Sequence, residues 1–308
     1  MLELTAVQQP VTLFEPMRYA TSAGGKKLRP ILLLICCEAV GGDTRAGLEA
    51  AVSLELVHNF TLVHDDIMDN DDLRRGRETV HKHWDKNIAI LVGDGLLVLA
   101  YSELARMKSD KFQQIACIFS DAILKVCEGQ ALDKEFEQRE SISMAEYLDM
   151  IDKKTAMLFS MACQVGAMLG GGSKEQIDAM GRYGHLLGRA FQIQDDLLDL
   201  IADESILGKD IGSDLMEHKK TFLVIHALEN APAHLLPDLK GALQKKSITS
   251  QDCLDIKHKM QEIGTIKAAQ DQIALTLNRA LASLKIIPHN TARSFLVELL
   301  DLIAQRNS

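Results

Sequence analysis

Apolar side chains recur at intervals of three and four residues along almost the whole chain. Leu33, Cys37 and Val40 fall on one side of a predicted helix, which a pair of glycines ends at residues 41–42. A longer helix is expected from about residue 45 to residue 69. No stretch alternates apolar and polar residues with the two-residue period of a strand. The pattern therefore predicts an all-α fold.

The same spacing predicts further helices toward the carboxyl end. They are expected at about residues 88–107, 112–137, 144–169, 175–202, 214–229, 234–245, 250–262, 264–285 and 290–305. Residues 1–23 form a lead-in, and the expected breaks are the glycines at 170–172, Gly208, Gly212 and Pro232. No repeat of fixed period occurs, so we expect one large domain over residues 1–308, although the length would also permit two.

Composition narrows the class of protein. Apolar residues make up 47% of the chain, aromatic residues make up 5%, and only 6 prolines interrupt 308 residues, which favours helices around a large core. The formal net charge of −9 argues against nucleic acid as a partner, because a phosphate backbone binds a basic surface. Carboxylates that hold a metal ion would still attract an anionic substrate through that ion.

Cysteine use and apolar run lengths indicate a cytoplasmic protein. The 6 cysteines include no CxxC pair, as expected for reduced thiols. No secretory signal is recognisable at the amino terminus. The longest apolar runs, at residues 30–37 and 88–100, fall short of the roughly 20 residues that a membrane span needs or are broken by polar positions. We therefore expect a soluble protein without a membrane span.

Two acidic motifs of the form DDxxD stand out, at Asp65–Asp69 and Asp195–Asp199. On a helix, the first and last aspartates of each motif face each other at four-residue spacing, and their charges repel. A hard divalent cation with oxygen ligands, such as Mg²⁺, relieves that repulsion. A lone motif is more often a solvated helix end, but a second copy on another apolar helix favours a metal site. The loops lack the glycine and terminal glutamate of an EF-hand.

Polar residues share the helix faces of both motifs. His58 and Thr61 lie on the face of the first motif, and Gln192 lies on the face of the second. If the two helices face each other, two carboxylate clusters line opposite walls of one cavity. Mg²⁺ suits such a cavity because it keeps several waters and takes a few carboxylates together with substrate phosphates.

Basic residues surround both motifs. Arg74 and Arg75 follow the first motif directly, and the segment GGKKLR at residues 24–29 offers two glycines and then three cations. Further cations are Lys153, Lys154, Lys209, Lys219 and Lys220. Any one of these is more often a solvated charge than a ligand. Together with two metal-binding motifs, however, lysine and arginine are the groups expected around a diphosphate leaving group.

The order of these motifs is similar to that of a known family. The segments are GGKKLRP, ELVHNFTLVHDDIMDNDDLRRG, KTA, GRAFQIQDDLLD and GKDIGSDLMEHKKT, with the core motifs between residues 24 and 221. They resemble trans-isoprenyl diphosphate synthases, and most of all short-chain archaeal-type geranylgeranyl diphosphate synthases. The resemblance implies a bundle of long antiparallel helices around a deep cavity, usually in a homodimer.

The resemblance also implies roles for individual residues. Magnesium, as three ions with substrate bound, would be held mainly by Asp65, Asp69 and Asp195, with Asp66 and Asp199 in support. The implied contacts to isopentenyl diphosphate are Lys26, Arg29, His58 and Arg75, and those to the allylic diphosphate are Arg74, Lys154, Thr155, Gln192, Lys209 and Lys219. The family commonly has glycine where this chain has His218.

The implied reaction forms a carbocation. Diphosphate leaves the allylic substrate, the double bond of isopentenyl diphosphate attacks the cation, and a proton is lost to the released diphosphate. The oxygens of Thr155 and Gln192 are candidates to stabilise the cation. Product length would depend on the floor of an apolar tunnel, for which helical spacing indicates Thr61 and the resemblance indicates Phe60, although Phe60 also fits an ordinary core position. A twenty-carbon product is favoured over a fifteen-carbon one.

Other readings of the same motifs remain open. A class I terpene cyclase would share the first motif, but its second metal motif usually contains Asn, Ser and Glu. A non-catalytic subunit of a heteromeric synthase typically lacks one of the two aspartate motifs. A helical di-metal protein would need Glu-x-x-His ligands, and neither motif has one nearby.

Overall fold

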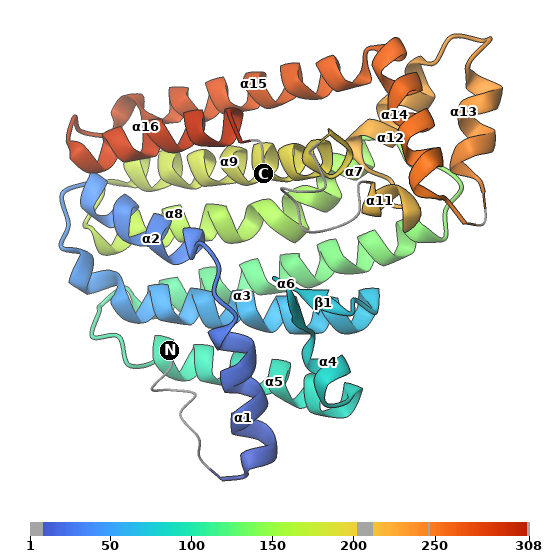
Figure 1. Ribbon diagram of the computed structural model, residues 1–308. Helices are drawn as coiled ribbons and strands as arrows, with labels where there is room; N and C mark the ends of the chain where they lie inside the picture. The colour runs from blue at the N-terminus through green and yellow to red at the C-terminus, as the bar shows by residue number, and fades with distance from the viewer. Residues whose placement is uncertain (1–8, 202–211, 246, 307–308) are drawn as a thin grey trace. The chain divides into compact units, whose positions relative to one another are not determined.

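The computed structural model describes residues 9–201, 212–245 and 247–306 (Figure 1). The chain divides into two compact units. The first comprises Met1–Ile123, Met161–Gly181 and Ile287–Arg293, and the second comprises Leu124–Ser160, Arg182–Ile286 and Ser294–Ser308. Almost every element is a helix, which confirms the predicted all-α fold.

The first unit is built on two helices that pack along each other, α3 (Leu48–Asp69) and α5 (Lys86–Leu104) (Figure 1). Its other elements are α1 (Val11–Ser22), α2 (Leu28–Ala39), η1 (Thr44–Gly47), β1 (Leu73–Arg74), β2 (Arg77–Glu78) and α4 (Val80–His83). Leu54 of α3 and Val92 of α5 are fully buried, and the Ser53 hydroxyl donates to the carbonyl of Ala100 at 2.8 Å. This packing holds the end of α3, and with it the first aspartate motif, in place.

The second unit carries the second aspartate motif on α9 (Lys174–Ile201). Its other elements are α7 (Met144–Ile151), the π-helix η2 (Asp152–Ala156), α11 (Ser213–Met216), α12 (Phe222–Asn230), α13 (Leu236–Leu243), α14 (Ser250–Ile263), α15 (Thr265–Ser283) and η3 (Leu284–Ile286). Residues of α6 (Phe112–Glu137), α8 (Met157–Leu169), α9 and α16 (Thr291–Ala304) belong to both units. Tyr183 on α9 is fully buried, and its hydroxyl donates to the carbonyl of Leu296 on α16 at 2.7 Å.

Most predicted helix boundaries are confirmed within a few residues, with three differences. The predicted helix over 144–169 contains the π-helix, and a two-stranded hairpin follows α3 where no strand was expected. The prediction of one helix over 214–229 is wrong, because the chain leaves the helical path between α11 and α12. Gly208, an expected break, lies outside the described residues.

His218 explains the break between α11 and α12. Its φ is +57°, in the left-handed region, directly after the carboxyl end of α11. The backbone N–H of His218 donates to Leu215 and that of Lys219 to Asp214, at 3.0 and 2.9 Å. This is the Schellman pattern, in which glycine is the usual left-handed residue because a Cβ is disfavoured there. The glycine common in the resembling family therefore has a conformational reason, and histidine adopts the same conformation here.

Replacing this histidine by glycine is expected to stabilise the protein. His218→Gly removes the cost of a left-handed side-chain-bearing residue, about 1–2 kcal/mol, less the greater chain entropy of glycine, so we expect roughly 0.5–1 kcal/mol in the free energy of unfolding. Urea denaturation would measure it. The matched control is Glu217→Gly, one residue earlier at φ −85°, which should destabilise. A loss of stability in His218→Gly would contradict this interpretation.

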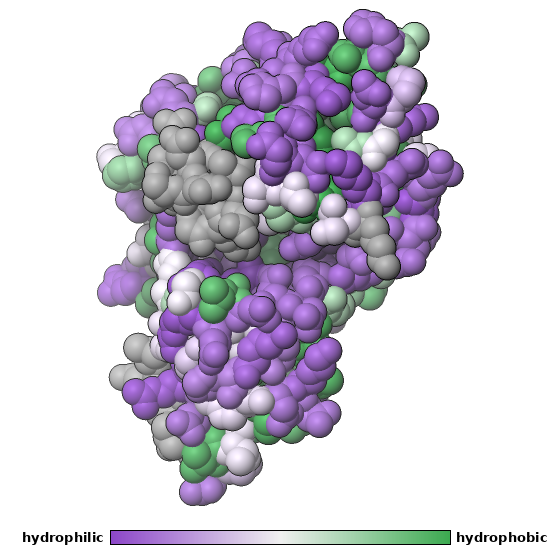
Figure 2. Space-filling model, turned by 45° about the vertical axis from the view of Figure 1, so that its right-hand side comes forward, coloured by the Kyte–Doolittle hydropathy of each residue, from purple (hydrophilic) through white to green (hydrophobic). Residues whose placement is uncertain are grey.

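On the face shown in Figure 2, the described surface is mostly hydrophilic, with smaller hydrophobic groups between hydrophilic ones. One helix among the described residues, α5, is long and apolar enough to cross a membrane by length and composition. Only 39% of its most apolar window is buried. Leu91, Val98 and Tyr101 lie along its exposed side at helical spacing.

Candidate active site

The first aspartate motif forms the last turn of α3. Asn70 adopts a left-handed conformation with φ +56° and ends the helix, so the chain turns directly into the hairpin that carries Arg74. Arg74 Nη2 lies 2.5 Å from the Asp66 carboxylate and 3.0 Å from that of Asp71. Burial raises the pKa of Asp66, and the charge of Arg74 opposes that shift. Asp66 is thus the partner of Arg74, while Asp65 and Asp69 face each other one turn apart on α3.

A glycine pair and the hairpin turn enclose Arg75. Arg75 sits at the turn with φ +54°, and its Nη1 donates to the carbonyl of Gly24. Gly25 has φ +105°, and a Cβ at that position would lie 2.6 Å from the Arg75 guanidinium carbon. The left-handed conformation favours glycine at position 25, and a Cβ there would displace the Arg75 guanidinium. The segment GGKK and the pair RR, which are distant in sequence, therefore meet in the first unit.

His58 lies within this basic group. Its Nε2 is 3.2 Å from Nη1 of Arg29. Burial, followed by the charges of Arg29, Arg75, Lys27 and Arg74, lowers the pKa of His58 well below its ordinary value. The ring is therefore neutral near pH 7 and can accept a hydrogen bond from Arg29. Of the four predicted isopentenyl diphosphate contacts, the structure gathers Arg29, His58 and Arg75, while Lys26 is exposed on the neighbouring loop.

In the second unit, Lys154 and Thr155 lie on the π-helix, a form that is frequent at functional sites. Two glycines let neighbouring helices approach this turn closely. A Cβ on Gly129 of α6 would lie 2.3 Å from the Lys154 backbone nitrogen, and one on Gly188 of α9 would lie 2.6 Å from the Cα of Ala156. The turn is therefore held between the two helices, which fixes where its side chains point.

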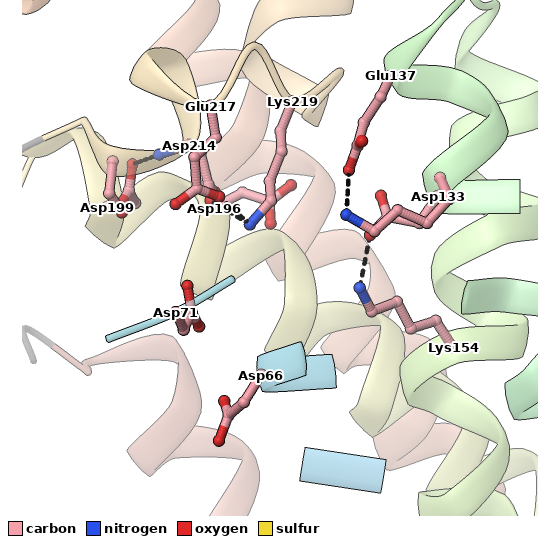
Figure 3. A network of polar contacts seen from close by, with 12 residues as sticks. Asp66, Asp71, Asp133, Glu137, Lys154, Asp196, Asp199, Asp214, Glu217 and Lys219 are labelled. Carbon is pink, nitrogen blue, oxygen red and sulfur yellow. Dashed lines mark hydrogen bonds and ion pairs between the residues drawn. The ribbon is translucent and has the colours of Figure 1, made fainter. Parts of the chain in front are cut away.

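A cavity of about 90 Å³ opens beside this turn. It is lined by Asp133, Tyr147, Met150, Ile151, Lys154, Thr155, Gln192, Asp196, Asp214, Lys219, Lys220 and Thr221. Lys154 Nζ lies 2.5 Å from the Asp133 carboxylate, and Lys219 lies 3.5 Å from Asp214 and 2.7 Å from Glu217 (Figure 3). Both lysines line the cavity and are paired with carboxylates, so an anion that enters it would share each lysine with a carboxylate.

Hydrogen bonds link the π-helix to the second motif. The Thr155 hydroxyl donates to Gln192 Oε1 at 2.7 Å, and Gln192 Nε2 donates to Asp196 Oδ1 at 2.9 Å. The Tyr147 hydroxyl donates to Asp196 Oδ2 at 2.6 Å. Burial raises the pKa of Asp196, with a further contribution from Asp214, while these two hydrogen bonds oppose the shift. Asp196 is therefore buried in the cavity wall, with both carboxyl oxygens engaged by other lining residues.

The outer aspartates of the second motif have different surroundings. Asp199 accepts from the Ser213 hydroxyl at 2.6 Å and from the backbone N–H of Asp214 at 3.1 Å, at the start of α11. Burial and the charge of Asp199 raise the pKa of Asp214. Asp195 is paired with Arg306. The guanidinium carbon of Arg306 also lies 4.9 Å from the ring centre of Phe191. These carboxylates form an acidic group that favours a cation.

The donor set fits a hard metal ion. Among the described residues, no group of three or more His, Cys, Asp or Glu side chains is arranged as a metal site. Mg²⁺ needs no such group, because it usually binds through one or two carboxylates together with substrate phosphates and water. The two motifs provide only carboxylate oxygens for this purpose, at Asp65, Asp69, Asp195 and Asp199, and basic side chains for phosphates lie beside both motifs.

Sequence reasoning missed several residues that the structure places at these sites. They are Asp133, Tyr147, Asp196, Asp214 and Arg306. Asp196 and Asp214 stand within recognised motifs, while Asp133, Tyr147 and Arg306 meet their partners from distant parts of the chain. Lys209, a predicted allylic contact, lies outside the described residues. Thr61 donates to the His58 carbonyl at 2.9 Å, and Phe60 is buried in edge-to-face contact with His64 at 4.9 Å.

Comparisons with known proteins agree on one family. Its profile, described as polyprenyl synthetase, matches residues 10–260. A geranylgeranyl diphosphate synthase from Methanosarcina mazei is 47% identical over 74% of this chain and 71% of its own length. A geranylfarnesyl diphosphate synthase from Natronomonas pharaonis is 36% identical over 99% and 93%. The crystal structure of geranylgeranyl pyrophosphate synthetase from Pyrococcus horikoshii matches with a TM-score of 0.93 at 39% identity, covering 99% of this chain and 93% of that one.

Proposed function

The chain belongs to the polyprenyl synthetase family, and we propose that it condenses isopentenyl diphosphate with an allylic diphosphate to give a short trans-prenyl diphosphate. The allylic substrate is dimethylallyl, geranyl or farnesyl diphosphate, and the favoured product is geranylgeranyl diphosphate. One observation carries the proposal. Lys154, Thr155 and Gln192 line one cavity, so a cation for the leaving diphosphate lies beside two oxygens suited to a carbocation.

The first step breaks the carbon–oxygen bond of the allylic substrate, and the electron pair leaves with diphosphate. In this proposal, Lys154 and Lys219 bind the leaving group, as would Lys209 and Arg74. Thr155 and Gln192 turn their oxygens toward the developing cation. Their dipoles are fixed before the reaction, so no reorganisation is needed when charge develops.

In the second step, the double bond of isopentenyl diphosphate attacks the cation and forms the new carbon–carbon bond. A proton is then lost to the released diphosphate, which restores a double bond. We assign the binding of isopentenyl diphosphate to Lys26, Arg29, His58 and Arg75. Neutral His58 accepts from Arg29, which leaves the guanidinium oriented toward an anion. Positioning and exclusion of water are the main contributions of the protein.

Magnesium is the metal that we propose for both motifs. Bound with substrate, it neutralises charge on the leaving diphosphate. Asp65, Asp69 and Asp195 are the proposed main ligands, with Asp66 and Asp199 in support, for three ions in the loaded enzyme. Asp66 would support the bound ions while it remains paired with Arg74.

The proposed twenty-carbon product follows the Methanosarcina mazei relative and the aromatic residue at position 60. A fifteen-carbon product is the second candidate. We further propose that residues 1–308 act as one catalytic domain, because the family match over residues 10–260 includes segments of both compact units.

We also propose that the chain is a soluble cytoplasmic homodimer, with the exposed side of α5 at the interface. Leu91, Val98 and Tyr101 are 53%, 65% and 37% exposed. Burial of these side chains against a second copy would remove the apolar stripe from water. Tyr101 is hydrogen-bonded to Ser120 of α6 at 3.0 Å, so α6 flanks the proposed interface.

Charges on this side of α5 are expected to dissociate the dimer. The double variant Leu91→Glu/Val98→Glu should raise the dimer Kd at least about 100-fold, because two buried carboxylates would meet their symmetry mates. Sedimentation equilibrium would measure the change. The control is Leu302→Glu, at a leucine that is 66% exposed on α16. A monomeric wild-type protein that floats with lipid vesicles would contradict the interface.

Incubation with substrates tests the proposed function itself. Purified protein, Mg²⁺ and isopentenyl diphosphate would be combined with dimethylallyl, geranyl or farnesyl diphosphate, and the products resolved by chain length. A dominant linear diphosphate that disappears with EDTA is expected. A cyclised hydrocarbon would indicate a terpene cyclase instead, and a folded protein inactive with every primer would refute the catalytic proposal.

A further inference from the structure

Two buried residues are joined by hydrogen bonds to the side chains proposed to meet the cation. They are Asp196 of the second motif and Tyr147 of α7, which are 5% and 1% exposed. Both belong to one hydrogen-bonded series, Tyr147–Asp196–Gln192–Thr155, in which every neighbouring pair lies within 2.9 Å. All four residues line the cavity. Thr155 and Gln192 are the two residues proposed above to stabilise the allylic cation, and this inference rests on that proposal.

The chemistry of the carboxylate fixes the orientation of the glutamine amide. Both oxygens of the Asp196 carboxyl group accept a hydrogen bond, one from Gln192 Nε2 and one from the Tyr147 hydroxyl, and an amide has a donor nitrogen and an acceptor oxygen at opposite ends. Gln192 must therefore present Nε2 to Asp196, as the 2.9 Å contact has it. Tyr147 occupies the other carboxylate oxygen, and because burial and the charge of Asp196 raise the pKa of Tyr147, the phenol keeps its proton and stays a donor.

The same constraint passes on to Thr155. With Nε2 held by Asp196, Gln192 Oε1 is the end that meets the Thr155 hydroxyl, so Thr155 must donate its only hydroxyl proton to that oxygen. Once these hydrogen bonds are made, Thr155 and Gln192 can offer only oxygen lone pairs to the cavity. If the amide turned over, Nε2 would donate to Thr155, and the hydroxyl proton would be released toward the cavity. One flip thus reverses two dipoles.

We propose that Tyr147 and Asp196 are positioning residues that keep the Gln192 amide oxygen and the Thr155 hydroxyl oxygen directed at the reacting cation. Asp196 differs in this from Asp195 and Asp199 of the same motif, since its two oxygens are engaged by Gln192 and Tyr147 in the interior. Dipoles fixed in advance stabilise charge in a transition state without the cost of reorganisation.

The supports of the series are rigid. Tyr147 lies at the start of α7, where a capping box between Ser143 and Glu146 fixes the first turn. Thr155 lies on the π-helix. Gly129 of α6 and Gly188 of α9 have no side chain, so both helices pack directly against the backbone of this turn and hold it in place. Gln192 and Asp196 are one turn apart on α9. The direction of these hydrogen bonds can therefore change only if a side chain rotates.

Two single variants test the proposal by kinetics. Asp196→Asn has the same shape but can accept or donate, so the Gln192 amide is no longer held in one direction. We expect kcat to fall by about 100-fold, in the range observed for loss of one transition-state dipole. Tyr147→Phe leaves the carboxylate in place and should lower kcat by about 10-fold. Both KM values should change little, because the lost interaction acts in the transition state.

A matched control separates positioning from stability. Tyr183→Phe removes the same hydroxyl from another fully buried tyrosine of the second unit, one that donates to the Leu296 carbonyl at 2.7 Å. Both tyrosine variants should lose similar thermal stability. Only Tyr147→Phe should lose kcat. Equal kcat values in the two folded variants would overturn the role of Tyr147.

A second substitution provides a rescue that a structural defect would not show. Glutamate at position 192 has oxygen at both ends, so in Asp196→Asn/Gln192→Glu one oxygen accepts from Asn and the other faces Thr155 whichever way the group turns. We expect kcat at least about 10-fold above that of Asp196→Asn. Gln192→Glu alone places two carboxylates together and should stay impaired. If the wild-type protein is active, the proposed function stands, and absence of rescue or a wild-type kcat in Asp196→Asn would overturn this inference alone. An inactive wild-type protein would refute both.

Discussion

Replacement of Asp65 by asparagine is expected to lower kcat about 1,000-fold, which corresponds to about 4 kcal/mol of lost transition-state stabilisation. Asparagine keeps the size of the side chain and an oxygen, but it removes the charge that a hard divalent cation requires. Asp65 belongs to the last turn of α3 and lies on the same helix face as Asp69. The variant should therefore lose activity through weaker Mg²⁺ binding and not through unfolding.

A stability measurement distinguishes these two causes. Without Mg²⁺, Asp65→Asn removes a like-charge pair at four-residue spacing, so the protein should be unchanged or more stable by roughly 0.2–0.5 kcal/mol. With Mg²⁺ and diphosphate, the wild-type protein should gain more thermal stability than the variant, because only ligands bound to the folded state stabilise it. Activity and ligand-induced stability should fall together.

Asp72→Asn is the matched control. Asp72 lies seven positions after Asp65, its side chain is 77% exposed, and it pairs with Lys82 at 2.8 Å. An exposed ion pair contributes little, at most about 1 kcal/mol, so this variant should retain nearly full activity. Comparable losses in the two variants, or an Asp65→Asn enzyme that needs no more Mg²⁺ than wild type, would contradict the assignment of Asp65 as a ligand.

The sequence predicted those features that depend on local spacing. The apolar period defined α3 and α9, and the fixed distance between aspartates placed each motif at a helix end, which the structure confirms. The expected break after α8 is also present, with Gly171 at φ +78°. Such features follow from residues within one or two turns of each other. No knowledge of the tertiary structure is required to find them.

What the sequence could not supply depends on distant partners. Asp196 is an aspartate like Asp195 and Asp199 of the same motif. Unlike them, it is bonded to the hydroxyl of Tyr147, which is 49 positions away, at 2.6 Å. Glycine is unfavourable within helices, and its presence at positions 129 and 188 is explained only by the close approach of the π-helix backbone. The left-handed His218 looked like an ordinary helical residue, because its conformation is set by a cap and not by its own preference. The assigned roles of the site residues themselves stay predictions until they are tested.

Phe60→Ala is expected to shift the product toward longer chains. The phenylalanine is 8% exposed on α3, one turn before the first motif, and its ring contacts the His64 ring edge-to-face. His64 in turn lies against α5 where Gly93 leaves space, since a Cβ there would be 2.0 Å from its Nε2. The phenylalanine ring therefore has support behind it and can act as a fixed floor. Removing the ring would open space on α3 before the first motif, so a longer product should become dominant.

The alternative, that Phe60 is only a core residue, predicts a different result. Loss of a buried phenylalanine costs about 3–5 kcal/mol of stability in either case, so stability alone does not decide. Phe119→Ala is the matched control, because Phe119 is 1% exposed in the same unit, on α6. Products resolved by chain length should lengthen in Phe60→Ala and stay unchanged in Phe119→Ala. An active Phe60→Ala enzyme with the wild-type product would leave Thr61, whose hydroxyl is bonded to the His58 carbonyl, as the residue to test. A longer product in Phe60→Ala alone would mean that a single supported ring on α3 sets the number of condensations.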